Sequence, residues 1–87
     1  MITKEIILKN QEGLHARPAT EIAKNASKYS CDIKFDVKGA HYNAKSVLNI
    51  MSAGIKDSTQ ITLICEGVDE EKALNGIVQT FEANSLV

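Results

Sequence analysis

The stretch CDIKFDVKG, residues 31–39, alternates between apolar and charged side chains. A period of two residues predicts a strand that packs one face on a core and leaves the other in water. The expected inward-facing residues are Cys31, Ile33, Phe35 and Val37. Such a strand belongs to an open-faced sheet, which helices cover on one side only.

Strand signals also occur on both sides of this stretch. Lys38-Gly39 predicts a tight turn into a short partner strand within residues 40–44. Residues 3–10, TKEIILKN, predict an earlier strand that ends before the NQEG turn signal. Residues 59–67, TQITLICEG, alternate again and predict a fourth strand.

Three stretches carry helical signals. They cover residues 16–30, 45–54 and 68–85, and the last shows the clearest pattern. Ser46 suits the N-cap of the second helix, and Gly54 suits the position just past its end. The buried stripes of the first and third helices are expected to contain Ala19, Ile22, Ala23, Ala26, Tyr29, Ala73, Leu74, Ile77, Val78 and Phe81.

The third helix has acidic residues at its start. Asp69 is expected to cap it, and Glu70 and Glu71 suit the positive end of the helix. The predicted order is strand, helix, strand, strand, short helix, strand, helix. We expect these elements to form a single domain spanning residues 1–87.

Charge and hydropathy argue against two classes of function. The net charge of −1 does not supply the basic patch that nucleic-acid binding needs. No apolar run approaches the ~20 residues of a membrane helix, and charged residues interrupt the first ten positions. We therefore expect a cytoplasmic protein with no membrane insertion and no direct nucleic-acid contact.

The two cysteines, Cys31 and Cys65, lie far apart in sequence and lack the spacing of a zinc or iron–sulfur site. We expect no metal at these positions. Both residues fall on apolar strand faces, where free cysteines act as small hydrophobic residues. The sequence leaves their redox state open.

The most unusual cluster of residues is GLHARPAT, residues 13–20. Proline is favoured in the first helical turn, so Pro18 places His15 at or beside the N-cap of the first helix. Gly13 gives the preceding turn its backbone freedom. Arg17 adds a permanent cation beside the histidine.

This cluster predicts a phosphate site. A helix start has unpaired amides and a partial positive charge, and both attract phosphate. The same charge favours the neutral, nucleophilic form of the His15 ring, and the guanidinium of Arg17 matches phosphate oxygens. A solvated surface histidine with an unrelated surface arginine is the alternative, and these residues alone do not exclude it.

GLHARPAT resembles the active-site signature of HPr, the family of histidine-containing phosphocarriers in the bacterial phosphotransferase system for sugar uptake. The family has similar sequences at the positions of three further segments, ASKY (26–29), NAKSVLNIMSAG (43–54) and EGVDEEKAL (66–74). The resemblance covers essentially the whole chain. It implies an α+β fold, the HPr-like open-faced β-sandwich, with an antiparallel sheet of strand order 1-4-2-3 and three helices on one face.

The resemblance also implies a function. His15 would accept a phosphoryl group from Enzyme I, with Arg17 stabilising its charge, and pass the group to sugar-specific IIA domains. Gly13, Ala16 and Pro18 would support the site at the helix start. The family implies no cofactor, and we expect a monomer.

Ser46 has two interpretations. A serine N-cap is ordinarily structural. In Gram-positive HPr relatives, however, the matching serine is phosphorylated by HPr kinase/phosphorylase in catabolite repression, which involves a transcription factor. Val47, Leu48 and Met51 are similarly either core residues or, with Thr20 and Arg17 at the rim, a docking patch for partners.

The alternative function is a mainly regulatory HPr paralogue that acts as a binding module for a transcription factor. Such a paralogue is expected to lack the histidine, so His15 favours the carrier. A third possible function is that of a paralogue phosphorylated in a nitrogen-related or single-sugar branch of the phosphotransferase system. The residues around Ser46 argue against this function without excluding it.

Two loops depart from the family pattern. Lys38 stands where asparagine is frequent, and Asp57-Ser58 stands where a glycine is common. Both loops are distant in sequence from His15, so we expect them to alter loop geometry and not function. His41 has no charged partner nearby in sequence and is expected on the surface.

Overall fold

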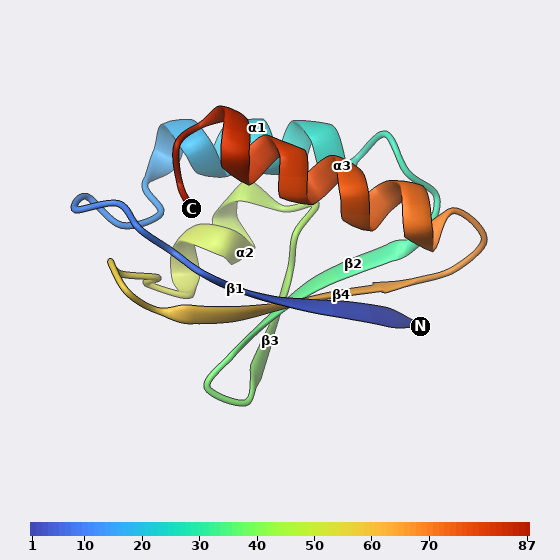
Figure 1. Ribbon diagram of the computed structural model, residues 1–87, viewed down its shortest axis with the longest axis horizontal. Helices are drawn as coiled ribbons and strands as arrows, with labels where there is room; N and C mark the ends of the chain where they lie inside the picture. The colour runs from blue at the N-terminus through green and yellow to red at the C-terminus, as the bar shows by residue number, and fades with distance from the viewer.

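The computed structural model describes residues 1–87 and contains seven helices and strands in the predicted order (Figure 1). They are β1 (Ile2–Ile7), α1 (Ala16–Ala26), β2 (Asp32–Val37), β3 (Ala40–Asn43), α2 (Val47–Ser52), β4 (Gln60–Glu66) and α3 (Glu70–Ala83). No helix has the length and apolar character needed to cross a membrane.

The four strands form one antiparallel sheet of order β1-β4-β2-β3, which confirms the expected topology. The register pairs Ile33 with Cys65 and Phe35 with Leu63, so the apolar sets of the two central strands share one face. All three helices lie on that face, and the other face is uncovered (Figure 1). The alternation of residues 31–39 therefore predicted the layering correctly.

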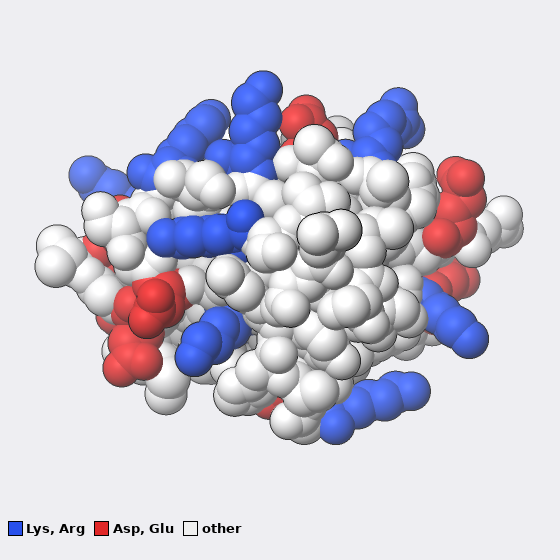
Figure 2. All heavy atoms as spheres, turned by 180° about the vertical axis from the view of Figure 1, so that it is seen from behind, with Lys and Arg blue, Asp and Glu red and all other residues white.

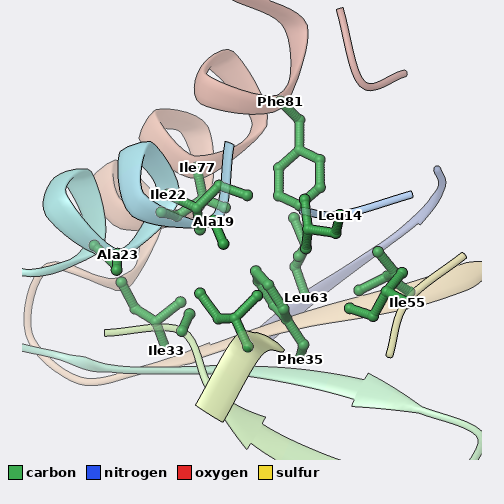
Figure 3. Packing of buried hydrophobic residues seen from close by; sticks show 14 of the residues in the cluster. Leu14, Ala19, Ile22, Ala23, Ile33, Phe35, Ile55, Leu63, Ile77 and Phe81 are labelled. Carbon is green, nitrogen blue, oxygen red and sulfur yellow. The ribbon is translucent and has the colours of Figure 1, made fainter. Parts of the chain in front are cut away.

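A single apolar core fills the space between helices and sheet (Figure 3). Phe35 from β2 and Phe81 from α3 are fully buried, and their rings meet edge to face with centroids 5.8 Å apart. Such a pair contributes about 0.5–1.5 kcal/mol beyond the burial of its area. The core therefore joins the last helix directly to the centre of the sheet.

The first helix is shorter than predicted. It ends at Ala26, and Ser27 forms its C-cap, so Tyr29 lies beyond the helix and not in its stripe. Tyr29 still packs against the core from the following loop. Its hydroxyl occupies the space that a side chain at Gly76 of α3 would need, which explains a glycine inside that helix.

The β2–β3 hairpin turns at Lys38 and Gly39, which both have positive φ, 55° and 87°. The amide of Gly39 donates to Oδ1 of Asp36 at 3.0 Å. The hairpin register sets His41 opposite Asp36, with 3.4 Å between Nε2 and Oδ2. His41 is exposed, as predicted, and hairpin pairing supplies the charged partner that its sequence neighbours do not.

Asp69 does not cap α3 in the predicted way. It occupies the N-cap position, but its side chain makes no capping hydrogen bond. The carboxylate instead accepts hydrogen bonds from the amides of Ser30 and Cys31, both at 2.9 Å. These bonds, led by that from Ser30, lower the pKa of Asp69 and tie the start of β2 to the start of α3.

Cys31 and Cys65 are buried, as the apolar strand faces predicted, and both are free. Burial, followed by the hydrogen bond to Asp69, raises the pKa of Cys31 to about 11. Burial also raises the pKa of Cys65. Both thiols therefore remain protonated near neutral pH and serve the core as small hydrophobic groups.

The two hydrogen bonds to Asp69 should make stability depend on pH. Because the folded pKa is lowered, the stabilisation is present above the unfolded value, about 3.9, and is lost as pH falls through the folded value. We expect Asp69→Asn to be less stable than the parent at pH 7, with the difference shrinking by pH 3. Urea unfolding followed by circular dichroism measures both quantities.

The matched control is Asp32→Asn, which removes an exposed carboxylate from the neighbouring strand. It should leave the pH dependence almost unchanged. A difference between parent and Asp69→Asn that is equally large at pH 3 and pH 7 would contradict the role assigned to the charge.

Candidate functional site

His15 is the N-cap of α1, as the position of Pro18 predicted. Its backbone is extended, with φ −88° and ψ −174°, and its carbonyl accepts from the amide of Ala19 at 3.0 Å. Its side chain makes no capping hydrogen bond and is one-third exposed. The ring is therefore accessible at the positive end of the helix.

The first turn of α1 offers two free backbone donors. The amides of Ala16 and Arg17 make no hydrogen bond to any other group of the protein. Pro18 has no amide hydrogen, and the next amide, that of Ala19, is already bonded to His15. The donors available to an anion at this helix end are therefore those adjacent to His15.

Gly13 sets the direction of the chain entering the site. Its φ is 69°, a left-handed conformation that favours glycine. A Cβ atom here would lie 2.6 Å from the carbonyl oxygen of Ile55, which is too close. That carbonyl accepts from the amide of Leu14 at 2.9 Å, so the site loop lies directly on the segment before β4.

Asp57 helps to hold the loop that precedes His15, although it is far from that loop in sequence. Its Oδ1 accepts from the amide of Asn10 at 3.0 Å, and Oδ1 of Asn10 accepts from the amide of Glu12 at 2.9 Å. This variation is distant from the His15 signature in sequence, but it lies against the site loop in space. The neighbouring Ser58 has φ 68°, a conformation that explains why glycine is common there.

Sequence reasoning missed Glu12 as a neighbour of His15. Its Oε1 lies 3.9 Å from Nε2 of His15, and its side chain is largely exposed. The distance corresponds to an electrostatic contact and not to a hydrogen bond. The sequence did contain a signal for this contact, namely an acidic residue three positions before the candidate histidine.

Arg17 lies exposed at the second position of the helix, and no hydrogen bond or ion pair holds its guanidinium. Thr20 is exposed one turn later, with its hydroxyl donating to the carbonyl of Ala16 at 2.7 Å. Both side chains are on the exposed surface of the first part of α1. The guanidinium is therefore available to an incoming anion.

Ser46 is the N-cap of α2, as predicted. Its Oγ accepts from the amide of Asn49 at 3.2 Å. Asn49 in turn accepts from the amide of Asn43 at 2.6 Å, which fixes the helix against the end of β3. Lys45 points elsewhere, because its Nζ donates to the carbonyl of Tyr29 at 2.7 Å.

The α2 helix exposes part of its apolar surface. Leu48 is 83% exposed and Met51 is 40% exposed, whereas Ile50 is fully buried. Val47 is partly buried and packs against the core, so it contributes less to the surface than the other two. Figure 2 shows a broad central area without charged side chains, bordered by lysine and arginine side chains and, on the left and right of the view, also by acidic ones.

The fold and the histidine at the helix start define the class of small histidine phosphocarriers. The family model described as "PTS HPr component phosphorylation site" matches residues 2–83. The chain belongs to this family, the HPr phosphocarriers of the phosphotransferase system.

Individual relatives agree with this assignment. The chain is 40% identical over 84 residues to the phosphocarrier protein HPr of Mycoplasma pneumoniae, covering 95% of this chain and 96% of the relative. A solved Mycoplasma histidine-containing phosphocarrier superposes with a TM-score of 0.97 at 37% identity, covering 99% of this chain and 98% of the other. An HPr dimer from Thermoanaerobacter tengcongensis gives 0.76 at 40% identity, with 91% of each chain covered.

Proposed function

We propose that the protein accepts a phosphoryl group from Enzyme I on a ring nitrogen of His15 and delivers it to sugar-specific IIA domains. The observation that carries this proposal is the position of His15 at the start of α1, next to the free amides of Ala16 and Arg17. A phosphoryl group on the ring can approach these donors. Family membership supports the same chemistry.

The transfer requires few protein groups. The lone pair of a neutral ring nitrogen attacks phosphorus, an N–P bond forms, and the bond to the donor breaks as its electron pair leaves with the donor. A charge-assisted hydrogen bond contributes about 1.5–3 kcal/mol and a helix end about 0.3–2 kcal/mol. These interactions orient the phosphoryl group without making its release slow, which suits a carrier.

Arg17 supplies the unpaired cation of the site. It is exposed and unpaired, so it can contact phosphate oxygens during transfer. Gly13, Ala16 and Pro18 act through the backbone, because they place the loop and the helix start around His15. No group other than the side chains and amides named here is required for the step, so we propose no cofactor and no metal.

The surface of α2 is the proposed docking site for partners. Leu48 and Met51 provide exposed apolar area, and Val47 lies beside them in sequence, partly buried against the core. Thr20 and Arg17, exposed on α1, are proposed as its rim. Methionine adapts to differently shaped partners, which a carrier with several acceptors needs. The lysines and arginines at the margin favour partners with acidic surfaces (Figure 2).

Ser46 is proposed as a second, regulatory phosphorylation site in catabolite repression, modified by HPr kinase/phosphorylase and read by a transcription factor. It is partly exposed, and it stands at the start of α2 beside Leu48. A phosphate at this helix start adds negative charge with little cost to folding. The same charge at the docking surface would repel acidic partners.

The remaining proposals concern the protein as a whole. We propose a monomeric, cytoplasmic protein whose residues 1–87 form one domain, although several structures of solved relatives are described as dimers. A mainly regulatory binding module is the weaker alternative. The presence of His15 in an accessible position favours the carrier over that module.

The carrier function predicts labelling at one histidine. With phosphoenolpyruvate and Enzyme I, we expect an acid-labile, base-stable phosphate on the parent and none on His15→Ala. His41→Ala, which removes the other histidine, should be labelled as the parent is. The phosphate is measured by mass spectrometry under neutral and acidic conditions, and a label that persists in His15→Ala would refute the assignment.

The regulatory proposal predicts a second, chemically different label. With ATP and HPr kinase/phosphorylase, the parent should gain an acid-stable phosphate that Ser46→Ala lacks. Ser52→Ala, a change at the other end of α2, is the control and should be labelled normally. Absence of the acid-stable phosphate from the parent would contradict the proposal for Ser46 without affecting that for His15.

A further inference from the structure

Glu12 is the one acidic group in contact with the His15 ring. Its Oε1 faces Nε2 at 3.9 Å, while the free amides of Ala16 and Arg17 belong to the helix that follows. The charged surroundings of the histidine are therefore asymmetric. One ring nitrogen faces a carboxylate, and the start of the helix supplies positive charge.

Glu12 is held near the ring by the backbone of its loop. The amide of Glu12 donates to Asn10, whose own amide donates to Asp57. Gly13 then packs against Ile55, which leaves the next part of the loop little freedom. The side chain is exposed, but its attachment point is fixed by hydrogen bonds that cross from one loop to another.

We propose that Glu12 is a positioning residue for phosphoryl transfer at His15, an inference that rests on the function proposed above. The carboxylate favours the proton on Nε2, because a negative charge stabilises the N–H that faces it. The lone pair is then on Nδ1, which becomes the attacking atom. Glu12 thus selects the tautomer of the ring before the phosphoryl group arrives.

The same carboxylate compensates charge during the reaction. When the Nδ1 lone pair forms the N–P bond, the bond from phosphorus to the donor breaks and Nε2 keeps its proton. The ring then carries a positive charge, which Glu12 stabilises across the contact. On delivery to an acceptor the N–P bond breaks, its electron pair returns to Nδ1, and the ring is neutral again.

The expected effect is modest because the contact is long and the carboxylate is exposed. Exposed ion pairs contribute little, so removal of the charge should change a rate or a tautomer ratio by roughly two- to five-fold. Charge reversal should have a larger effect in the same direction. This graded response separates an electrostatic role from a structural one.

The test compares Glu12→Gln and Glu12→Lys with the parent and with Glu5→Gln. The control removes the same charge from an exposed position on β1. Nitrogen-15 NMR at alkaline pH measures the tautomer ratio of the neutral His15 ring. We expect the fraction protonated at Nε2 to fall in the order parent, Glu12→Gln, Glu12→Lys, with Glu5→Gln equal to the parent.

Phosphoryl transfer rates from Enzyme I should follow the same order. Asp57→Ala should reduce the Nε2-protonated fraction as Glu12→Gln does, and Asp57→Asn, which keeps an oxygen acceptor for Asn10, should restore it. Equal tautomer ratios in parent and Glu12→Lys would overturn the inference. Failure of Enzyme I to label the parent would instead refute the proposed function, and the tautomer ratios would still decide the role of Glu12.

Discussion

The site depends on one close backbone approach, between Gly13 and the carbonyl of Ile55. A Cβ atom at residue 13 would lie 2.6 Å from that oxygen, and the next amide, that of Leu14, donates to it. This contact joins the loop before α1 to the loop before β4. It therefore sets the direction in which the chain enters α1 and the place where His15 stands.

Rigid and reactive parts of the molecule are separated along this loop. Below it, Leu14 and Ile55 are buried in the core that joins the helices to the sheet (Figure 3). Above it, His15 and Arg17 remain accessible, and the two free amides lie in the first turn of a helix whose far side is buried. A carrier benefits from this arrangement, because the acceptor is fixed by packing while its reacting face stays open to successive partners.

The sequence predicted those features that local patterns determine. Alternation in residues 31–39 predicted the open-faced sheet, and Pro18 predicted His15 as the N-cap, because both follow from the geometry of neighbouring residues. The strand order came from the family resemblance, since pairing between strands distant in sequence leaves no local signal. Tyr29 was placed in the helix because its spacing fitted, but the helix ends before it.

Two features that local patterns did not predict share one physical cause. Asp69 accepts from Ser30 and Cys31, and Asp57 accepts from Asn10, although each pair is separated by about forty residues or more. Local capping rules assign such carboxylates to the nearest helix or turn and do not see the distant amide that binds them. Glu12 is different, because it is near His15 in sequence. The sequence does not show how close its carboxylate lies to the His15 ring.

The central claim is that the start of α1 holds the phosphoryl group of His15. Amide NMR spectra recorded before and after phosphorylation by Enzyme I test it most directly. We predict that the amide proton resonances of Ala16 and Arg17 move downfield and exchange more slowly in the phosphorylated protein, because these free donors become bonded. Unchanged resonances at both residues in a protein shown to carry phosphate on His15 would contradict the claim.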